Sequence, residues 1–262
     1  HNLHNQLILI MLSEEEEKYR NQSEILRETN SELENINWIS THDLQEPLRK
    51  IQLITSKTLS ELDDITIESI SNSLERVTKS ASRMSGLLED ILKYTRIKNT
   101  RDTLQEVDLN EILEATIKEM SETITESNAI IEFEKLPEVH AIHFLMRQLF
   151  LNIIQNSLKY ASPDRQPKII ITASQEPVIM KHLYKVHCHW VRFSDNGIGF
   201  EPQYAESIFK IFTRLHRQEQ YTGSGIGLAL CKKIMQTIGG DIHAEGKPGE
   251  GTDIIIYFPC DP

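Results

Sequence analysis

Apolar residues recur at helical spacing through the first part of the chain. In one stretch they step by four and three in strict alternation, the a/d pattern of a helix that packs against other helices, at Ile70, Leu74, Val77, Ala81, Met84, Leu88 and Ile91. A similar seam precedes it, at Leu26, Leu33, Ile36, Leu44, Leu48, Ile51 and later Leu59 and Leu62. We interpret the acidic stretch 60–67, which carries β-branched residues, as the turn of an antiparallel helical hairpin.

A single hairpin of this kind buries little apolar surface, because each of its two helices carries only a narrow apolar seam. Two copies that pair through these seams make a four-helix bundle, in which the seams face a common core. We therefore predict a homodimer that forms through the hairpin.

The pattern changes after about residue 100, where short runs typical of strands alternate with helical ones. The strand-like runs are 129–133, 168–172, 182–193 and 252–258, and the helical runs are 144–160 and 226–238. Asp108 and Glu111 resemble the capping box of a further helix, and Gly239 with Gly240 is typical of a helix end. From about residue 105 onward we predict an α/β sandwich with helices on one face of a mixed sheet.

Length and composition indicate a globular protein of one to two domains, since 39% of its 262 residues are apolar and 26% are charged. Twenty-eight Lys and Arg against 39 Asp and Glu give a net charge of −11, which disfavours nucleic acid and anionic membranes as partners. An anionic ligand therefore needs a local site and a metal ion.

The longest apolar run, residues 7–12, is far shorter than the roughly 20 residues that a membrane-spanning helix needs. Cys188, Cys231 and Cys260 form no CxxC pair, which favours a reducing, cytoplasmic compartment. Because the first residue is His1 rather than Met, we expect a fragment of a longer protein, whose preceding part, including any targeting signal or anchor, the sequence does not show. Membrane tethering of the full-length protein stays open.

Asp195, Gly197 and Gly199 follow a predicted strand. A buried carboxylate at a strand end can accept a hydrogen bond from an exocyclic amine, and glycines let the backbone approach a flat ring closely. An ordinary turn is an equally common reason for this motif.

A second glycine cluster, residues 223–228, opens an apolar helix with the run Gly-Ser-Gly-Ile-Gly-Leu. Free N–H groups and the positive end of the helix dipole make such a helix start suitable for phosphates. A flexible hinge is the plainer alternative. The chain contains no Walker P-loop motif.

Asn152 and Asn156 share one face of a predicted helix, with Lys159 three residues further on. Neutral amide oxygens suit Mg²⁺, which keeps waters and binds phosphate oxygens, and Lys159 can neutralise more phosphate charge. An exposed polar helix face is the commoner alternative for such a pattern.

Taken together, these motifs resemble the ATP-binding boxes of sensor histidine kinases. In chain order they are Asn152-x-x-x-Asn156 with Lys159-Tyr160, Asp195-x-Gly197-x-Gly199, Phe209 and Phe212, Gly223-x-Gly225-x-Gly227, and Gly249-Glu250-Gly251-Thr252. Their order and spacing match the N, G1, F, G2 and G3 boxes of that family. The resemblance implies the Bergerat (GHKL) ATP-binding fold, shared with type II topoisomerases, Hsp90 chaperones and mismatch-repair ATPases.

The hairpin distinguishes sensor histidine kinases from the other proteins that share this ATP-binding fold. Its residues 40–49 read Ser-Thr-His-Asp-Leu-Gln-Glu-Pro-Leu-Arg. This run is similar to the H box of dimerising histidine kinases, especially the phytochrome-like subgroup. A neutral imidazole is a nucleophile near pH 7, and an adjacent carboxylate can hold one ring N–H so that the other nitrogen presents its lone pair. We assign His42 as the phosphoacceptor and Asp43 as its orienting base.

The resemblance implies attack of His42 on the γ-phosphate of Mg-ATP, followed by phosphoryl transfer to an aspartate of a response regulator receiver domain. It places Asn156 and Asn152 on Mg²⁺, Asp195 on the adenine amine, and a lid over residues 200–222. The other residues that it places at the nucleotide or its lid are Lys159, Tyr160, Gly197, Gly199, Phe209, Phe212, Arg214, Arg217, Thr222, Gly223, Ser224, Gly225, Gly227, Leu228 and Thr252.

By this resemblance we divide the chain into a helical linker from an upstream sensor domain missing from this chain (1–30), a dimerisation and phosphotransfer hairpin (31–100) and a catalytic ATP-binding domain (104–262). Glu46 stands where many relatives carry Thr or Asn, so phosphatase activity is in doubt. Ile142 stands where an Asp usually caps the helix of Asn152, a loss that we expect to cost about 1 kcal/mol.

The run His187-Cys188-His189 suggests a metal site at first sight. On a regular strand the two histidines share one side and the cysteine faces the other, and no further ligand is evident. We therefore expect no metal there.

Two other classes of protein are alternatives. The retention of His42, Asp43, Asn156 and Asp195 disfavours a catalytically silent ATP-binding scaffold. The H box disfavours a topoisomerase-like or chaperone-like machine. Whether His42 receives phosphate from its own subunit or its neighbour depends on the handedness of the turn near residues 63–64, which the sequence does not give.

Overall fold

The computed structural model describes residues 44–59, 66–97, 104–174, 178–180, 185–215 and 224–259. By its internal contacts the chain divides into two compact units, residues 1–85 and residues 86–262. The predicted seam positions before residue 44, the linker over residues 1–30 and most of the hairpin turn lie outside the described residues.

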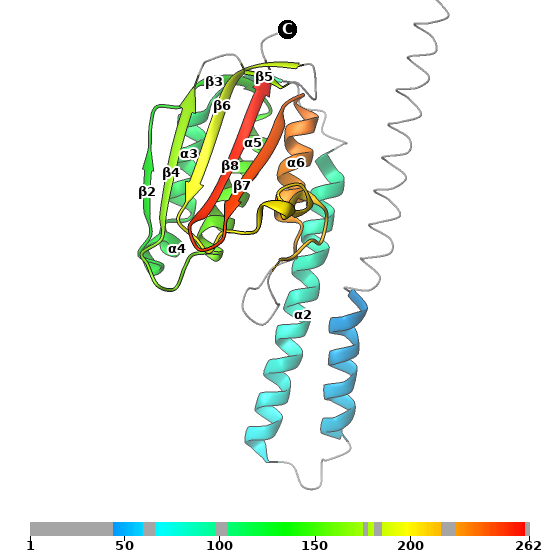
Figure 1. The fold of residues 1–262 in the computed structure, drawn as a ribbon. Coiled ribbons are helices and arrows are strands. Elements are labelled where there is room, and N and C mark those ends of the chain that lie inside the picture. The colour runs from blue at the N-terminus through cyan, green and yellow to red at the C-terminus, as the bar shows by residue number, and fades with distance from the viewer. Residues whose placement is uncertain are drawn as a thin grey trace, which may run out of the picture. The chain divides into compact units, whose positions relative to one another are not determined.

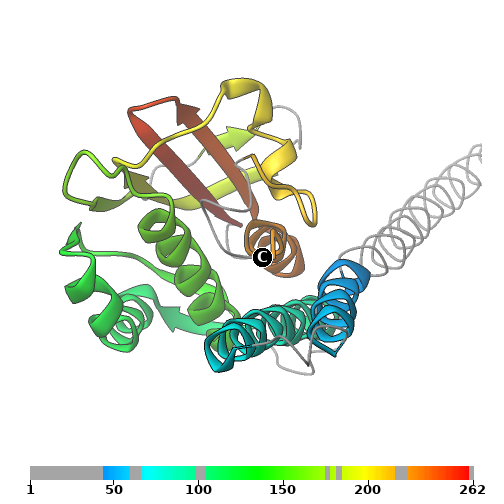
Figure 2. The ribbon, with the colours of Figure 1, turned by 90° about the horizontal axis from the view of Figure 1, so that it is seen from below.

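The first unit holds the first helix of the predicted hairpin and the second helix up to Ser85. A helix over residues 44–59 lies beside the first part of α2 (Ile67–Arg96), as Figures 1 and 2 both show. Thr66 begins α2, because its Oγ1 accepts a hydrogen bond from the backbone N–H of Ser69 at 3.2 Å, as an N-cap residue does. The turn that we predicted to include Ile67 therefore ends one residue earlier.

The apolar seam of α2 is only partly covered within one chain. Ile70, Val77 and Met84 are half-buried, whereas the side chains of Leu74 and Leu88 are 60% and 46% exposed. The helix over residues 44–59 likewise leaves Leu48, Leu53 and Leu59 exposed.

The second unit contains the α/β domain. Its helices after α2 are α3 (Leu109–Glu119), α4 (Ser121–Glu126), α5 (His143–Lys159) and α6 (Gly227–Thr237), with short 3-10 turns η3 (Pro202–Tyr204) and η4 (Ser207–Phe209). Its strands are β1 (Gln105–Asp108), β2 (Ile130–Phe133), β3 (Glu138–Ala141), β4 (Lys168–Ser174), β5 (Val178–Met180), β6 (Lys185–Asp195), β7 (Asp241–Lys247) and β8 (Gly251–Pro259).

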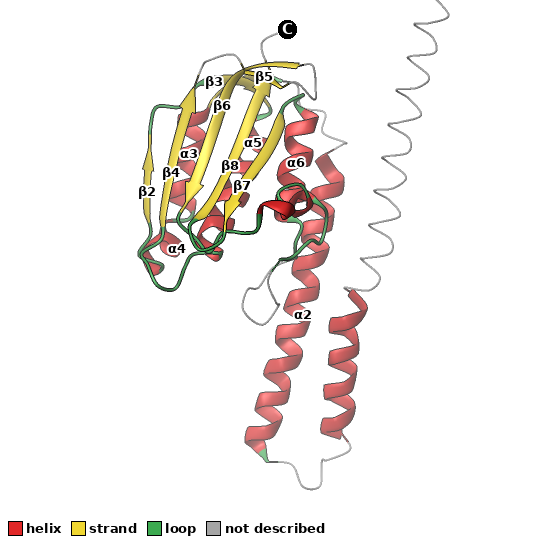
Figure 3. Cartoon of the chain, viewed as in Figure 1, coloured by secondary structure: helices red, strands yellow, loops and turns green. Residues whose placement is uncertain are grey.

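The main sheet has six strands in the order β2-β4-β6-β8-β7, with β5 paired to β6. β2 and β4 are parallel, and the remaining pairs of this sheet are antiparallel. Helices α3, α5 and α6 lie on one face of the sheet (Figures 1 and 3). The predicted mixed sheet with helices on one side is confirmed, although the sequence pattern did not reveal α4, β3, β5 or β7.

The core lies between this sheet and its helices. Phe150 of α5 and Phe193 of β6 meet edge to face, with ring centroids 5.0 Å apart, and both are fully buried. On β4, Ile169 and Ile171 are buried whereas Ile170 is partly exposed, so an all-isoleucine run still follows the two-residue period of a strand.

The helix ends agree with the predicted capping, with one difference. Asp108 caps α3, because its Oδ1 accepts from the backbone N–H of Asn110 at 2.7 Å. Ile142 precedes α5 without a side-chain cap, as expected, but it is only 6% exposed. Burial of this apolar side chain was not expected from the sequence, and it stabilises the fold independently of the missing cap.

The regular strand assumed for the run His187 to His189 is interrupted, because the backbone pairing of β6 with β8 shifts register between these two residues, as at a β-bulge. Among the described residues, no group of three or more His, Cys, Asp or Glu side chains is arranged to hold a metal. None of the described helices is both long and apolar enough to cross a membrane.

Candidate functional site

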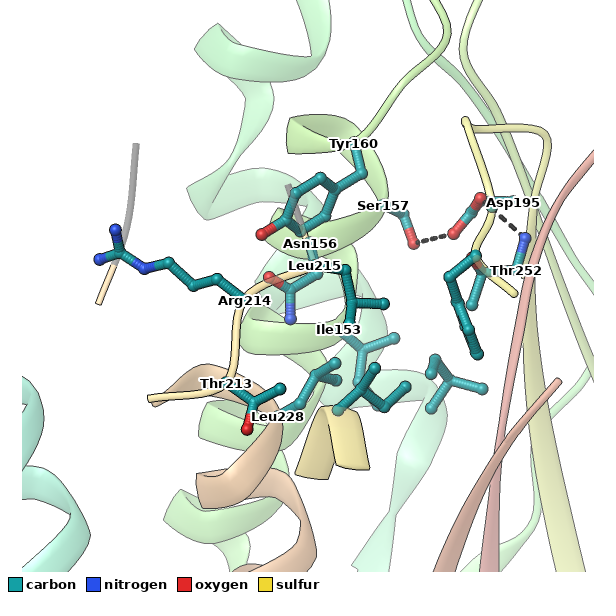
Figure 4. A pocket seen from close by; sticks show the side chains of 14 residues that line it. Ile153, Asn156, Ser157, Tyr160, Asp195, Thr213, Arg214, Leu215, Leu228 and Thr252 are labelled. Carbon is teal, nitrogen blue, oxygen red and sulfur yellow. Dashed lines mark hydrogen bonds between the residues drawn. The ribbon is translucent and has the colours of Figure 1, made fainter. Parts of the chain in front are cut away.

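A cavity of about 650 Å³ opens between α5, the ends of β6 and β8, and the segment that leads to α6. Of the predicted site residues it is lined by Asn156, Tyr160, Asp195, Gly199, Arg214, Leu228 and Thr252, and apolar side chains such as Ile153, Phe200 and Ile254 fill much of its remaining wall. Figure 4 shows Asp195 and Thr252 on one side of this cavity and Arg214 on the opposite side.

Asp195 is held by three hydrogen bonds at the end of β6. Its Oδ1 accepts from the backbone N–H of Gly197 at 2.9 Å and from that of Thr252 at 3.1 Å. Its Oδ2 accepts from the Ser157 hydroxyl at 3.1 Å (Figure 4). A carboxylate oxygen can accept two hydrogen bonds, so Oδ2 keeps capacity for a donor that enters the cavity.

Burial raises the pKa of Asp195 above the usual aspartate value, while the hydrogen bonds from Gly197, Ser157 and Thr252 act in the opposite direction. The ionised form therefore carries a desolvation penalty in the folded protein. Such a group in a concave, mainly apolar site is typical of a ligand-binding position rather than of a stabilising one.

The glycines around Asp195 are required by close backbone contacts. A Cβ atom on Gly197 would lie 2.4 Å from the carbonyl oxygen of Tyr160, and one on Gly199, whose φ is +64°, would lie 2.0 Å from that of Lys247. Gly251 is packed in the same way against the carbonyl oxygen of Asp195. These contacts argue for a tightly built loop rather than for an ordinary turn.

The other end of the site is more polar. A second cavity of about 1080 Å³ is lined by the predicted residues Asn152, Asn156, Lys159, Tyr160, Ser224, Gly225, Gly227 and Leu228. Asn156 borders both cavities, and its Nδ2 lies 3.6 Å from the position that a Cβ on Gly227 would take. The predicted amide pair and the second glycine cluster thus meet at the start of α6.

Lys159 and Asn152 differ in how they are engaged. The Lys159 ammonium lies over the Tyr160 ring, 4.6 Å from its centroid. The Asn152 side-chain oxygen accepts a hydrogen bond from Gln148 at 3.3 Å, and its Nδ2 is buried without a well-formed hydrogen bond among the described residues. Burial raises the pKa of the neighbouring Cys231 thiol to about 12, and the Asn152 side chain acts in the opposite direction.

Phe209 and Phe212 lie beside the cavities rather than in their walls. Phe209 is 7% exposed, and the ammonium of Lys232 on α6 lies 5.9 Å from its ring centroid. Phe212 adopts a left-handed φ of 63°, and its backbone N–H donates to the Gly225 carbonyl oxygen at 2.9 Å. The F-box segment is therefore fastened to the second glycine cluster.

Five predicted residues lie outside the described residues: His42, Asp43, Arg217, Thr222 and Gly223. Two contributors were missed from the sequence. Ser157 directly follows Asn156 on the predicted helix, and this position was the signal that the sequence offered. In the structure Ser157 is buried and donates a hydrogen bond to Asp195. Arg165, in the loop between α5 and β4, gave no signal because its partners are backbone atoms of distant glycines.

Comparison with known proteins agrees with this geometry. Residues 142–262 match the family described as "Histidine kinase-, DNA gyrase B-, and HSP90-like ATPase". The phytochrome-like protein Cph1 of Synechocystis sp. is 34% identical over 239 residues, which cover 89% of this chain and 30% of Cph1. Cyanobacterial phytochrome A of Nostoc sp. is 34% identical over 238 residues, covering 89% of this chain and 29% of that protein.

Two solved structures share the fold. The histidine kinase ThkA, crystallised in complex with the response regulator protein TrrA, is similar with a TM-score of 0.65 and 22% identity, over 89% of this chain and 64% of that one. The Acinetobacter baumannii histidine kinase AdeS is similar with a TM-score of 0.58 and 16% identity, over 84% and 98%.

The second part of the chain is thus a domain of the ATPase class that histidine kinases share with DNA gyrase B and HSP90. Within this class, the chain is similar to proteins named phytochromes and sensory kinases. It spans less than a third of the length of the phytochrome relatives that it matches.

Proposed function

We propose that this chain is the catalytic portion of a sensor histidine kinase, which phosphorylates His42 with ATP and passes the phosphoryl group to an aspartate of a response regulator. The observation that carries this proposal is the half-buried Asp195 carboxylate, which lines a mainly apolar cavity next to a more polar one. An aromatic base with an exocyclic amine suits the first cavity, and a phosphate chain suits the second.

In this proposal Asp195 Oδ2 accepts a hydrogen bond from the adenine amine, beside the donor that it already has in Ser157. Gly199 and Thr252 border the base. The N-terminal end of α6, with Ser224 and Gly225 before it, faces the phosphates with the positive end of its dipole. Lys159 and Arg214 supply positive charge.

The residues at the polar end also fit a magnesium ion. Asn156 borders both cavities, and its side-chain Oδ1 and that of Asn152 are neutral oxygen donors, the latter already accepting a hydrogen bond from Gln148 at 3.3 Å. Magnesium usually takes one or two oxygen ligands from the protein and the rest from phosphates and waters. When bound, Mg²⁺ would neutralise charge on the phosphates, with Asn156 and Asn152 as its protein ligands.

The phosphoryl transfer needs a nucleophile and its orientation. We assign an imidazole nitrogen of His42 to attack the γ-phosphorus while the bond to the β-phosphate oxygen breaks and ADP leaves. Asp43 would accept a hydrogen bond from the other ring nitrogen and stabilise the positive charge that develops on the ring.

Two partners belong to this proposal. The exposed apolar residues of the hairpin, among them Leu53 and Leu74, would pack against a second copy of the chain. A receiver domain would dock against the hairpin near His42. Glu46 forms ion pairs with Lys50 at 2.7 Å and with Arg83 at 3.8 Å, an arrangement that gives no support for a phosphatase role.

The test is incubation with Mg-ATP labelled at the γ-phosphate. Wild-type protein should acquire an acid-labile, alkali-stable label, and His42→Gln should acquire none while it still binds ATP. The matched control His140→Gln, at a histidine of β3 away from both cavities, should label as the wild type does.

The alternatives predict different results. A silent scaffold would bind ATP without any label. A conformational machine would hydrolyse ATP steadily, and His42→Gln would not change the rate.

A further inference from the structure

Arg165 lies outside both cavities, yet it connects two loops that border the first. Its Nη2 donates to the carbonyl oxygen of Gly197 at 2.8 Å and to that of Gly249 at 2.6 Å. Gly197 follows β6, and Gly249 lies in the turn between β7 and β8. One guanidinium group therefore holds together two segments that are distant in the sequence.

The Arg165 contact fixes a peptide group next to Asp195. The peptide between Gly197 and Ile198 has its carbonyl oxygen bonded to Arg165 and its N–H bonded to the carbonyl oxygen of Tyr160 at 2.9 Å. On the other side of Gly197, its own N–H donates to Asp195 Oδ1. The orientation of the carboxylate thus depends on a backbone segment that Arg165 helps to hold.

The second loop reaches the same carboxylate from the opposite side. The Gly249 N–H donates to the Ile198 carbonyl oxygen at 2.7 Å, and the Thr252 N–H donates to Asp195 Oδ1 at 3.1 Å. A planar guanidinium suits a bridge between two carbonyl oxygens better than an ammonium does. With both loops fixed, Asp195 Oδ2 stays directed into the cavity.

We propose that Arg165 is a positioning residue for the base-binding end of the site, which keeps the Gly197 loop and the β7–β8 turn together. This inference rests on the proposed function, because it takes the cavity at Asp195 to hold adenine. Arg165 acts through the two loops and does not line the cavity. Its loss should therefore weaken adenine binding and leave the phosphate end unchanged.

The test compares binding of ATP, ADP, adenosine and inorganic triphosphate to wild-type protein and to Arg165→Gln by calorimetry, with competition for weak ligands. We expect the dissociation constants of the three adenine ligands to rise together, about tenfold. The constant for inorganic triphosphate should not change. Arg165→Lys keeps the charge but not the planar group, so its dissociation constants for the adenine ligands should lie between those of wild-type protein and of Arg165→Gln. It serves as the second variant if Arg165→Gln does not fold.

Arg147→Gln is the matched control. Arg147 also donates two hydrogen bonds, to Glu119 at 2.8 and 3.1 Å, but it lies away from the loops at Asp195, so its loss should leave all four ligands unaffected. In an Asp195→Asn background, Arg165→Gln should add much less than tenfold, because both changes act on one contact.

Unchanged adenine binding in Arg165→Gln would overturn the positioning role alone, as would an equal weakening of inorganic triphosphate. Wild-type protein that binds no ATP would instead overturn the proposed function, and the role of Arg165 with it.

Discussion

At the scale of single residues, two aspartates of the α/β domain have opposite electrostatic roles. Burial raises the pKa of Asp195 despite three hydrogen bonds. For Asp241, burial opposes ionisation, but contacts with His243 at 2.9 Å and with the Ile242 N–H hold its pKa below the usual value. The first carboxylate is held charged at a cost to stability, and the second contributes stability.

We predict that Asp195→Asn stabilises the nucleotide-free domain by about 0.5–2 kcal/mol at neutral pH. The asparagine can keep the bonds to Gly197 and Thr252 and donate to Ser157, while the desolvation penalty of the charge disappears. Nucleotide affinity should fall about tenfold to a hundredfold, because an amide N–H would face the adenine amine. Urea unfolding and calorimetry measure the two effects.

Asp241→Asn is the matched change with the opposite sign, since it removes a carboxylate that the contacts with His243 and the Ile242 N–H stabilise, and it should lower stability without affecting nucleotide binding. A loss of stability in both variants would contradict the assignment of Asp195 as a binding residue.

The pH dependence of stability follows from the same shifts. A carboxyl whose folded pKa is raised destabilises the fold once pH exceeds its unfolded value, and the penalty grows until pH passes the folded value. The contribution of Asp195 to wild-type stability should therefore fall as pH rises through this window above about pH 4. Subtracting the Asp195→Asn profile from the wild-type profile isolates this contribution, and a difference of zero across the window would contradict the raised pKa.

At the scale of elements, the start of α6 is fastened to the F-box segment. Gly225 has a φ of +77°, and a Cβ there would lie 2.9–3.1 Å from backbone atoms of Phe212 and Thr213. Phe212 itself is left-handed and bonds to Gly225. The helix end that we propose to face the phosphates is therefore positioned by this contact.

Gly225→Ala should displace the F-box segment and weaken ATP binding at least tenfold, because backbone atoms cannot yield as a flexible side chain does. Gly239→Ala is the control, since Gly239 has a similar φ of +78° but open space around its Cβ position. It should cost about 1 kcal/mol of stability and leave ATP binding unchanged. Equal effects of the two variants on ATP affinity would show that backbone strain alone is responsible.

The N-terminus of α5 carries a further prediction. Ile142→Asp would add the missing cap, worth about 1 kcal/mol, but would remove a buried apolar side chain worth about 1.5–3 kcal/mol. We expect net destabilisation in urea unfolding. A gain in stability would mean that the cap outweighs burial at this position.

Helices and strands could be predicted where their apolar residues recur with a clear period or where a residue typical of a helix end marks the boundary. The helix α5 and the strands β4 and β8 follow from apolar pattern, and Asp108 and Gly239 mark helix ends by local chemistry. The strands β3 and β7 escaped prediction because their charged residues mask the alternation, and β5 is too short to show a period. Pairing with neighbours, rather than local preference, makes these strands.

At the scale of the whole molecule, the hairpin leaves apolar side chains of its seam exposed, whereas the α/β domain buries a core of its own. We predict that Leu74→Glu converts a dimer into a monomer, because it sets a charge in the seam that a second copy would bury. Asn72→Glu, at an exposed polar position of the same helix, should leave the dimer intact. Sedimentation measures both, and a Leu74→Glu dimer would contradict pairing through this seam.

The site was predictable to the extent that its residues lie in local motifs. Asp195, Asn156 and the glycines stand at spacings that bring them to two neighbouring cavities, both of which Asn156 borders. Arg165 and Ser157 were not predictable in this way, because their roles depend on backbone and side-chain atoms from other elements. The Ile142 difference has the same origin, since burial is a property of the assembled fold.

The central claim is that ATP bound at Asp195 and Asn156 phosphorylates His42. The most direct measurement is mass spectrometry of peptides from protein incubated with Mg-ATP and kept at neutral or alkaline pH. We expect one phosphoryl group on the peptide that contains His42. This group should be absent in Asn156→Ala, and in His42→Gln no other residue should carry phosphate. Phosphate on another residue, or an unmodified His42 in protein that binds ATP, would contradict it.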